Sequence, residues 1–152
     1  MFTVTPFTIA ARFIGLREVA GAASNPTILG MLRIVDPLAS DDVVPWCGAF
    51  VEAVAWLLDL PRPRSLRARA WLHVGSAVAL EDAQIGWDVI ILKRGPDPQP
   101  GPEHTGAPGH VGFFAGFDGL DRLLVLGGNQ ADKVSVLSYP RAKVLGVRRL
   151  ML

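Results

Sequence analysis

The sequence predicts an α+β domain in which helices come first and an antiparallel sheet of about five strands follows. Two patterns predict this class. Residues 5–75 hold apolar runs with helical spacing, bounded by capping residues and glycines. After residue 86 the apolar runs are short, rich in β-branched residues and separated by turn residues. The 152 residues, of which 50% are hydrophobic, suffice for one core. We therefore expect a single domain over residues 1–152.

Four segments of the first half carry helix start and stop signals. Pro6 and Pro26 stand at first helical positions, where the missing backbone N–H costs nothing. Gly21 is the expected stop of the first helix, and Pro45 is tolerated in the first turn of the third. The expected helices lie in segments 5–21, 24–35, 42–60 and 65–75, with the N-caps Thr5, Asn25, Asp42 or Asp41, and Ser65.

Five short apolar segments of the second half predict strands, at residues 87–94, 110–117, 122–128, 133–139 and 143–150. Turn residues separate them, among them Asp118-Gly119 and the segment 129–132. Segment 94–109 consists mostly of Pro, Gly and polar residues and continues neither flanking strand. We expect it to be a mobile loop inserted into one sheet, and loops of this kind often carry or cover functional sites.

Composition and charge argue against several classes of protein. A net charge of +1 gives no electrostatic case for binding nucleic acid, and no run of 18 apolar residues predicts a membrane span. The N-terminal residues lack the pattern of a secretory signal, so we expect synthesis in the cytoplasm. One cysteine excludes an internal disulfide, and Glu103 and His104 lack a metal-ligand spacing with His110. We expect no metal, no cofactor and a monomer.

The only cysteine, Cys47, stands where the third helix is expected to begin. Unpaired N–H groups and the helix dipole stabilise a thiolate there, and a nucleophilic thiolate needs a base with an orienting partner. Of the three histidines, His110 opens a strand that can hold its ring, whereas His73 ends a helix and His104 lies in the loop. If Asn129 ends the antiparallel neighbour of that strand, the two side chains share one edge of the sheet. The sequence thus predicts a Cys47/His110/Asn129 site.

Each of these residues also has a structural interpretation. A free cysteine is often a small buried hydrophobe, and His110 fits a satisfied strand histidine. Asn129 fits a turn position in the left-handed conformation. Trp46 either lines a substrate groove or packs as a buried aromatic residue beside a helix start. Asp42 either caps the third helix or contacts a substrate amine.

Three motifs carry a family resemblance: WCGAFV at 46–51, GHVGFF at 109–114 and VLGGNQADKVSV at 125–136. In this order they resemble the NlpC/P60 and CHAP group of papain-like cell-wall hydrolases. The upstream IGLREVAGAASNPTIL resembles the helical N-terminus of a family of small phage and prophage proteins of this type. The resemblance extends from about Phe7 to Arg148. It implies a papain-like fold, with N-terminal helices packed on the C-terminal sheet.

The resemblance also implies a function. Members of the group cleave amide bonds in peptidoglycan, either between muramic acid and L-alanine or within the stem peptide. Cys47 matches the nucleophile, His110 the base and Asn129 the third polar group, a position that varies in type, so Gln130 competes for it. Trp46, Asp42 and Gln130 are the expected substrate contacts.

The expected partner is therefore bacterial peptidoglycan, reached after release or delivery from the cell. A phage or prophage lysin is the first interpretation. The alternatives are a non-catalytic peptidoglycan-binding or phage structural module, and an antibacterial amidase toxin with the same site.

Overall fold

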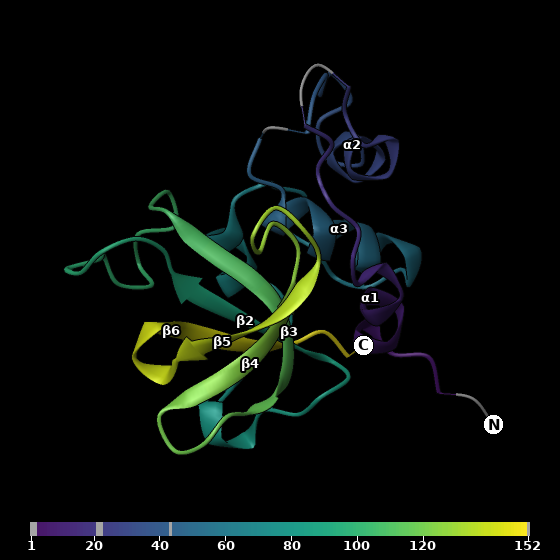
Figure 1. The fold of residues 1–152 in the computed structure, drawn as a ribbon. Coiled ribbons are helices and arrows are strands. Elements are labelled where there is room, and N and C mark those ends of the chain that lie inside the picture. Colours follow the sequence, from purple (N-terminus) through teal and green to yellow (C-terminus); the bar gives the residue numbers. More distant parts are fainter. Residues whose placement is uncertain (1–2, 21–22, 43, 152) are drawn as a thin grey trace.

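The computed structural model describes residues 3–20, 23–42 and 44–151, and its main element is one antiparallel sheet (Figure 1). Within these residues the sheet has six strands in the order β1-β6-β2-β3-β4-β5. Their bounds are Ser76–Val78 (β1), Asp88–Lys93 (β2), Gly109–Phe117 (β3), Arg122–Gly127 (β4), Ser135–Pro140 (β5) and Val144–Arg149 (β6). The protein is α+β, as the sequence predicts.

Five of the strands lie where apolar segments predict them, and β1 is an addition. β1 has three residues and pairs with β6, and its first two residues, Ser76 and Ala77, are exposed. A strand this short shows no alternation of apolar and polar residues, so the expected number of about five strands is one too few. β2 and β3 are paired neighbours, so the segment 94–108 that joins them connects two adjacent strands of the same sheet.

The helices are short, and their caps are partly those predicted. Thr5 forms a capping box and Asn25 accepts the N–H groups of Thr27 and Ile28, which confirms both caps. The third helix instead has Trp46 at its N-cap, so Asp42 does not cap it. The helices are α1 (Pro6–Ala10), α2 (Pro26–Arg33) and α3 (Cys47–Leu57), with the 3-10 helices η1 (Ala11–Phe13), η2 (Ala68–His73), η3 (Leu80–Asp82) and η4 (Arg141–Lys143).

The first helix is much shorter than its sequence pattern predicts. After η1 the chain extends, because the Gly15 N–H donates to the Val134 carbonyl (2.9 Å) and the Val134 N–H donates to the Leu16 carbonyl (2.7 Å). This pairing with a distant segment replaces the helical hydrogen bonds that local spacing favours. Gly21, the expected stop, lies outside the described residues.

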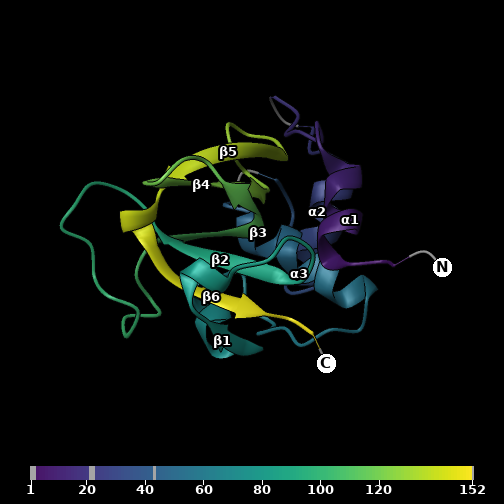
Figure 2. The same ribbon diagram turned by 90° about the horizontal axis from the view of Figure 1, so that it is seen from below.

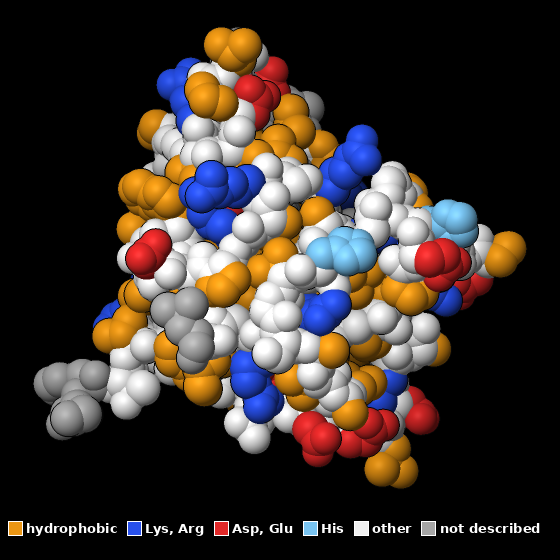
Figure 3. Space-filling model, turned by 180° about the vertical axis from the view of Figure 1, so that it is seen from behind, with side chains coloured by type: hydrophobic (Ala, Val, Ile, Leu, Met, Phe, Trp, Pro, Cys, Tyr) orange, Lys and Arg blue, Asp and Glu red, His pale blue; other side chains and the backbone are white. Residues whose placement is uncertain are grey.

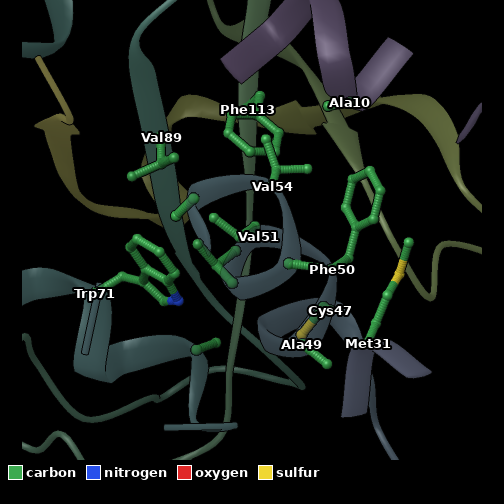
Figure 4. Packing of buried hydrophobic residues seen from close by; sticks show 14 of the residues in the cluster. Ala10, Met31, Cys47, Ala49, Phe50, Val51, Val54, Trp71, Val89 and Phe113 are labelled. Atoms are coloured by element: carbon green, nitrogen blue, oxygen red, sulfur yellow. The ribbon is translucent and has the colours of Figure 1, made fainter. Parts of the chain in front are cut away.

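The main core is built around α3, which is buried from Cys47 to Ala55 (Figure 4). The Phe50 ring meets Phe13 and Phe113 edge to face, with both centroid distances at 6.1 Å. Phe113 belongs to β3, so this contact joins the helix to the strand that carries His110. Aromatic pairs of this geometry add about 0.5–1.5 kcal/mol each beyond the area they bury.

The opposite face of the sheet carries a second core. Ile90 and Leu92 of β2 belong to this core, whereas Val89 and Ile91 belong to the main one. β2 is therefore buried on both faces, which its unbroken apolar run reflects. Figure 2 shows the strong twist of the sheet from β1 to β5. The second core contains Ile90, Leu92, Phe114, Leu123, Val125 and Val147.

Two whole-molecule properties bear on partners. None of the helices in the described part of the chain combines the length and the apolar character that crossing a membrane requires. On the face shown in Figure 3, Lys and Arg side chains are interspersed with Asp and Glu side chains. This distribution agrees with the near-neutral net charge of +1.

Candidate functional site

His110 is the second residue of β3. It lies at the end of the sheet where β3 begins and its neighbour β4 ends. β3 and β4 run antiparallel with Phe113 opposite Leu126, so the start of β3 lies beside the turn that follows Gly127. His110 is 8% exposed. The sequence predicts that Asn129 lies at this end of the sheet with His110, and Asn129 does lie in the turn after β4; the side chain that reaches the imidazole is that of its neighbour, Gln130.

Gln130 fixes the orientation of the His110 ring. Gln130 Oε1 lies 2.9 Å from His110 Nε2. Gln130 Nε2 donates to the carbonyl oxygens of Val125 (3.2 Å) and Ser135 (2.7 Å). Because the amide N–H groups are used there, the amide oxygen faces the ring and accepts its proton. Neutral His110 is therefore protonated on Nε2, which leaves a lone pair on Nδ1.

Tyr139, on β5, completes this network. Its hydroxyl donates to Gln130 Oε1 (3.0 Å), and its ring lies tilted beside the His110 ring with centroids 5.5 Å apart. Burial raises the pKa of Tyr139 to about 12, so the hydroxyl stays protonated and remains a donor at neutral pH. Gln130 is thereby held by two donors and two carbonyl acceptors.

Asn129 makes no hydrogen bond to the imidazole, whose partner is Gln130. It has a φ of 55° and lines the hollow beside His110, and its side chain makes no hydrogen bond to a described residue. The next residue turns inward because the Gln130 N–H donates to the Lys133 carbonyl (2.9 Å) and closes a tight turn. The orienting position predicted for Asn129 is occupied by Gln130. Gln130 is 2% exposed and is a buried support for His110; its contact with a substrate stays a prediction.

Cys47 is the first residue of α3, as predicted, and is 3% exposed. Burial raises the pKa of its thiol above the ordinary 9.0, although a backbone hydrogen bond from Val111 and the charge of Arg94 lower it. The resting cysteine is thus a neutral thiol, and the thiolate expected from its helix position is not the resting form. Because Val111 follows His110 on β3, its hydrogen bond places the sulfur beside the backbone that carries the imidazole.

The His110 imidazole is neutral as well. Burial lowers its pKa below the ordinary 6.5. The hydrogen bond to Gln130 raises this pKa in part, and the positive charge of Arg94 lowers it further. The site therefore holds a neutral thiol and a neutral imidazole near pH 7. Such a pair needs the proton to move from sulfur to nitrogen before or during attack on a substrate.

Two hollows open onto the site, and Arg94 lines both. Cys47 lines the first, which we call the Cys47 hollow, together with Pro108 and Gly109. His110 lines the second, which we call the His110 hollow, together with Asn129, Gln130, Tyr139, Lys93, Lys143 and others. The exposed Arg94 is thus the residue common to the surroundings of the thiol and of the imidazole.

Two glycines after β4 make room for these contacts. A Cβ atom on Gly127 would lie 3.1 Å from His110 Nε2 and 2.8 Å from Gln130 Oε1. A Cβ atom on Gly128 would lie 2.6 Å from the Trp46 ring. Any larger residue at either position therefore displaces the imidazole, its support or the residue before Cys47.

Trp46 and Asp42 are both structural here. Trp46 is fully buried and its indole N–H donates to Glu18 Oε1 (2.7 Å), so it does not line an open groove. The Asp42 carboxylate accepts the backbone N–H groups of Asn25 (2.8 Å) and Val19 (3.3 Å), and the bond from Asn25 lowers the pKa of Asp42. In the structure Trp46 and Asp42 contact Glu18, Val19 and Asn25.

The Pro- and Gly-rich loop is tethered, whereas the sequence predicts a mobile one. Arg69, in η2, is fully buried, and its guanidinium donates only to carbonyl oxygens of this loop. Its acceptors are Pro108 (2.9 Å), Pro100 (2.9 Å), Gly101 (2.7 Å) and His104 (3.4 Å). Since Pro108 also lines the Cys47 hollow, this anchor sets one wall of that hollow.

The two other histidines lie away from both hollows. His73 is an exposed residue at the end of η2. His104 is exposed and lies 3.3 Å from the carboxylate of Glu103. His110 is thus the histidine that the fold brings to Cys47.

Three residues of the site are not predicted from the sequence: Arg69, Arg94 and Tyr139. Tyr139 is the only tyrosine of the chain, and it ends the predicted strand that follows the turn with Asn129 and Gln130. This position could have indicated that Tyr139 belongs to the site. Arg69 and Arg94 resemble ordinary surface arginines, because their partners lie far away in the sequence.

The chain matches no protein-family model, and a search of curated proteins finds no match either.

Proposed function

We propose that the protein is a thiol hydrolase that cleaves an amide bond of peptidoglycan. The observation that carries the proposal is the joint position of Cys47 and His110. The thiol starts a core helix, the imidazole stands on the adjoining strand with Nδ1 unprotonated, and Gln130 holds the other ring nitrogen at 2.9 Å. A thiol at a helix start beside an imidazole on a sheet edge is the papain-like plan. The substrate class rests on the sequence motifs around these residues.

The proposed reaction uses the neutral pair. His110 Nδ1 accepts the thiol proton as the sulfur attacks the scissile carbonyl carbon, and backbone N–H groups at the start of α3 stabilise the oxyanion. His110 then gives the proton to the leaving amine, and a thioester remains on Cys47. Water attacks the thioester while His110 takes its proton, the acid product leaves, and the thiol is restored. Gln130 keeps the ring oriented throughout.

The proposed activity is tested by incubating purified peptidoglycan sacculi with the wild-type protein and with Cys47→Ala. Turbidity is followed and released fragments are identified by mass spectrometry. Clearing by the wild type alone is expected. Stems that begin at L-alanine would identify an N-acetylmuramoyl-L-alanine amidase, and shortened stems an endopeptidase. Equal release by both proteins, or by neither, would refute the cysteine mechanism, provided that Cys47→Ala unfolds at a temperature close to that of the wild type.

A second function is favoured by one observation, namely that the thiol and the imidazole are 3% and 8% exposed. So little exposure suits a catalytically idle peptidoglycan-binding or phage structural module. Such a module would sediment with sacculi without releasing fragments.

A lysin and an antibacterial amidase toxin would share the hydrolase site and differ in how they reach the cell wall. We place the lysin first. An adjacent holin gene supports the lysin, and an adjacent immunity gene supports the toxin.

A further inference from the structure

The charged side chains that line the His110 hollow are positive. Three cationic residues line it, Lys93, Arg94 and Lys143, and none of its described lining residues is Asp or Glu. The whole chain carries a net charge of only +1, so this concentration of positive charge is local. A concave surface lined by one sign of charge attracts ligands of the opposite sign, because its low-dielectric walls focus the field.

Two of these cations have no partner of their own. Among the described residues, Lys93 and Arg94 make no side-chain hydrogen bond and no ion pair, and the ion pairs of the described chain lie elsewhere. Lys143 donates to the Gly95 carbonyl (2.8 Å), which uses one of its three N–H groups. The hollow is thus lined by positively charged side chains that have N–H groups free to bind a ligand. By contrast, the buried cation Arg69 is engaged by loop carbonyls.

Arg94 is a cationic residue of both hollows. It lines the Cys47 hollow and the His110 hollow, so it borders any chain that passes from the thiol to the imidazole. A guanidinium presents a planar set of donors that pairs with a carboxylate through two parallel hydrogen bonds. Lys143 and Lys93 add charge without that geometry, which makes Arg94 the residue that distinguishes a carboxylate from a neutral amide.

We propose that the His110 hollow is a subsite for a free carboxylate of the substrate peptide, with Arg94 as its main ligand. The proposal rests on the proposed function for the identity of that peptide. It narrows the substrate class to peptidoglycan stems that carry a free carboxylate close to the scissile amide. Stems in which that carboxylate is amidated are poor substrates.

The test uses two stem peptides that differ in one group, the α-carboxylate of the D-glutamyl residue in one and its carboxamide in the other. Binding is measured by calorimetry on Cys47→Ala, so that no turnover occurs, or on Cys47→Ser if the alanine variant is unfolded. We expect the carboxylate peptide to bind about tenfold or more tightly, because a hydrogen bond to a charged partner is worth more than a neutral one. The difference should shrink when the salt concentration is raised.

Arg94→Gln, made in the same background, should remove most of the preference for the carboxylate. Arg12→Gln is the matched control, because it also deletes one exposed positive charge but lies on η1, outside both hollows. It should preserve the preference. Equal binding of the two peptides to the parent protein would overturn the proposal, and so would an unchanged preference in Arg94→Gln. Displacement of the peptide by an equal concentration of inorganic phosphate would overturn the assignment to a peptide carboxylate.

The binding readout separates this inference from the proposed function. A carboxylate preference that depends on Arg94, found in a protein that releases nothing from sacculi, refutes the hydrolase and supports the subsite. Release from sacculi together with equal binding of both peptides refutes the subsite and supports the hydrolase.

Discussion

Gln130 decides which nitrogen of His110 is available for chemistry. Its amide N–H groups are held by the carbonyls of Val125 and Ser135, so its oxygen accepts from Nε2 and leaves Nδ1 unprotonated. A ring with the other tautomer would present an N–H group, which accepts no proton from a thiol. A buried side chain that orients the ring therefore controls the base in the proposed reaction.

Gln130→Ala should lower kcat by about 100-fold or more while leaving KM nearly unchanged, because the ring loses its orientation and substrate contacts stay in place. Asn129→Gly is the matched control. It removes the neighbouring side chain, and glycine tolerates the φ of 55° found at that position. It should keep most of the activity. Both constants would be measured on a soluble stem peptide, with thermal unfolding as a check on folding. The opposite ranking would return the orienting role to Asn129.

The pH dependence of kcat/KM should reflect the shifted pKa of His110. The base must be neutral, and burial lowers its pKa below 6.5, so wild-type activity should persist at pH 6.5 and fall only at lower pH. Arg94→Gln removes a positive charge that lowers this pKa. Its acid limb should therefore move to higher pH, whereas that of Arg12→Gln should not move. A wild-type acid limb well above pH 6.5 would contradict a neutral resting imidazole.

At the scale of elements, the Arg69 anchor turns a Pro- and Gly-rich segment into a wall of the site. One buried guanidinium is held by four carbonyl oxygens between Pro100 and Pro108. The loop lacks a helix or strand of its own, so these bonds replace the backbone pairing that would otherwise order it.

Arg69→Met should free the loop. A protease that cuts after glutamate should then cleave at Glu103 more than about tenfold faster, because each lost hydrogen bond to a charged group contributes roughly 1.5–3 kcal/mol. The expected products are residues 1–103 and 104–152. Arg12→Met, which deletes an exposed arginine of η1 that makes no hydrogen bond to the loop, is the control and should be cut at the wild-type rate. Equal rates for the two variants would mean that Arg69 does not order the loop.

Local pattern predicted the elements well and the contacts between them poorly. The five main strands, Thr5 and Asn25 as caps, and the edge shared by His110 and the turn after β4 were all readable, because each depends on nearby residues. The first helix was predicted too long, since its end is set by Val134, more than a hundred residues away. The sequence allows Asn129 the left-handed turn conformation that it adopts. It does not show that Gln130 reaches His110, because that position depends on hydrogen bonds from Gln130 to the backbone of Lys133, Val125 and Ser135. Arg69 was missed because its acceptors lie 31–39 residues further along.

At the scale of the whole molecule, the site is supported by the main core. Phe50 packs between Phe13 and Phe113, and Phe113 lies three residues after His110 on the same strand. Cys47 lies one turn before Phe50 on α3. The position of the thiol relative to the imidazole therefore depends on how tightly this helix packs against β3.

Phe50→Ala should lower the free energy of unfolding by about 3–5 kcal/mol, because it leaves a cavity between helix and sheet. For a chain of this size that corresponds to a fall in Tm of roughly 6–20 °C. Leu57→Ala, on the same helix but 54% exposed, should change stability by less than about 1 kcal/mol. Calorimetry on both variants provides the comparison. A small effect of Phe50→Ala would show that the core does not depend on this ring.

The position of β6 has a consequence for biosynthesis. β6 is the last strand in the sequence, yet it lies between β1 and β2 inside the sheet. The ribosome makes β2 about fifty residues before its neighbour β6. One edge of β2, a strand with two apolar faces, therefore stays unpaired until residue 149 has emerged. Unpaired apolar edges invite association with other chains. Nascent chains of this protein should therefore be most dependent on chaperones in the interval after β2 has emerged and before β6 has emerged.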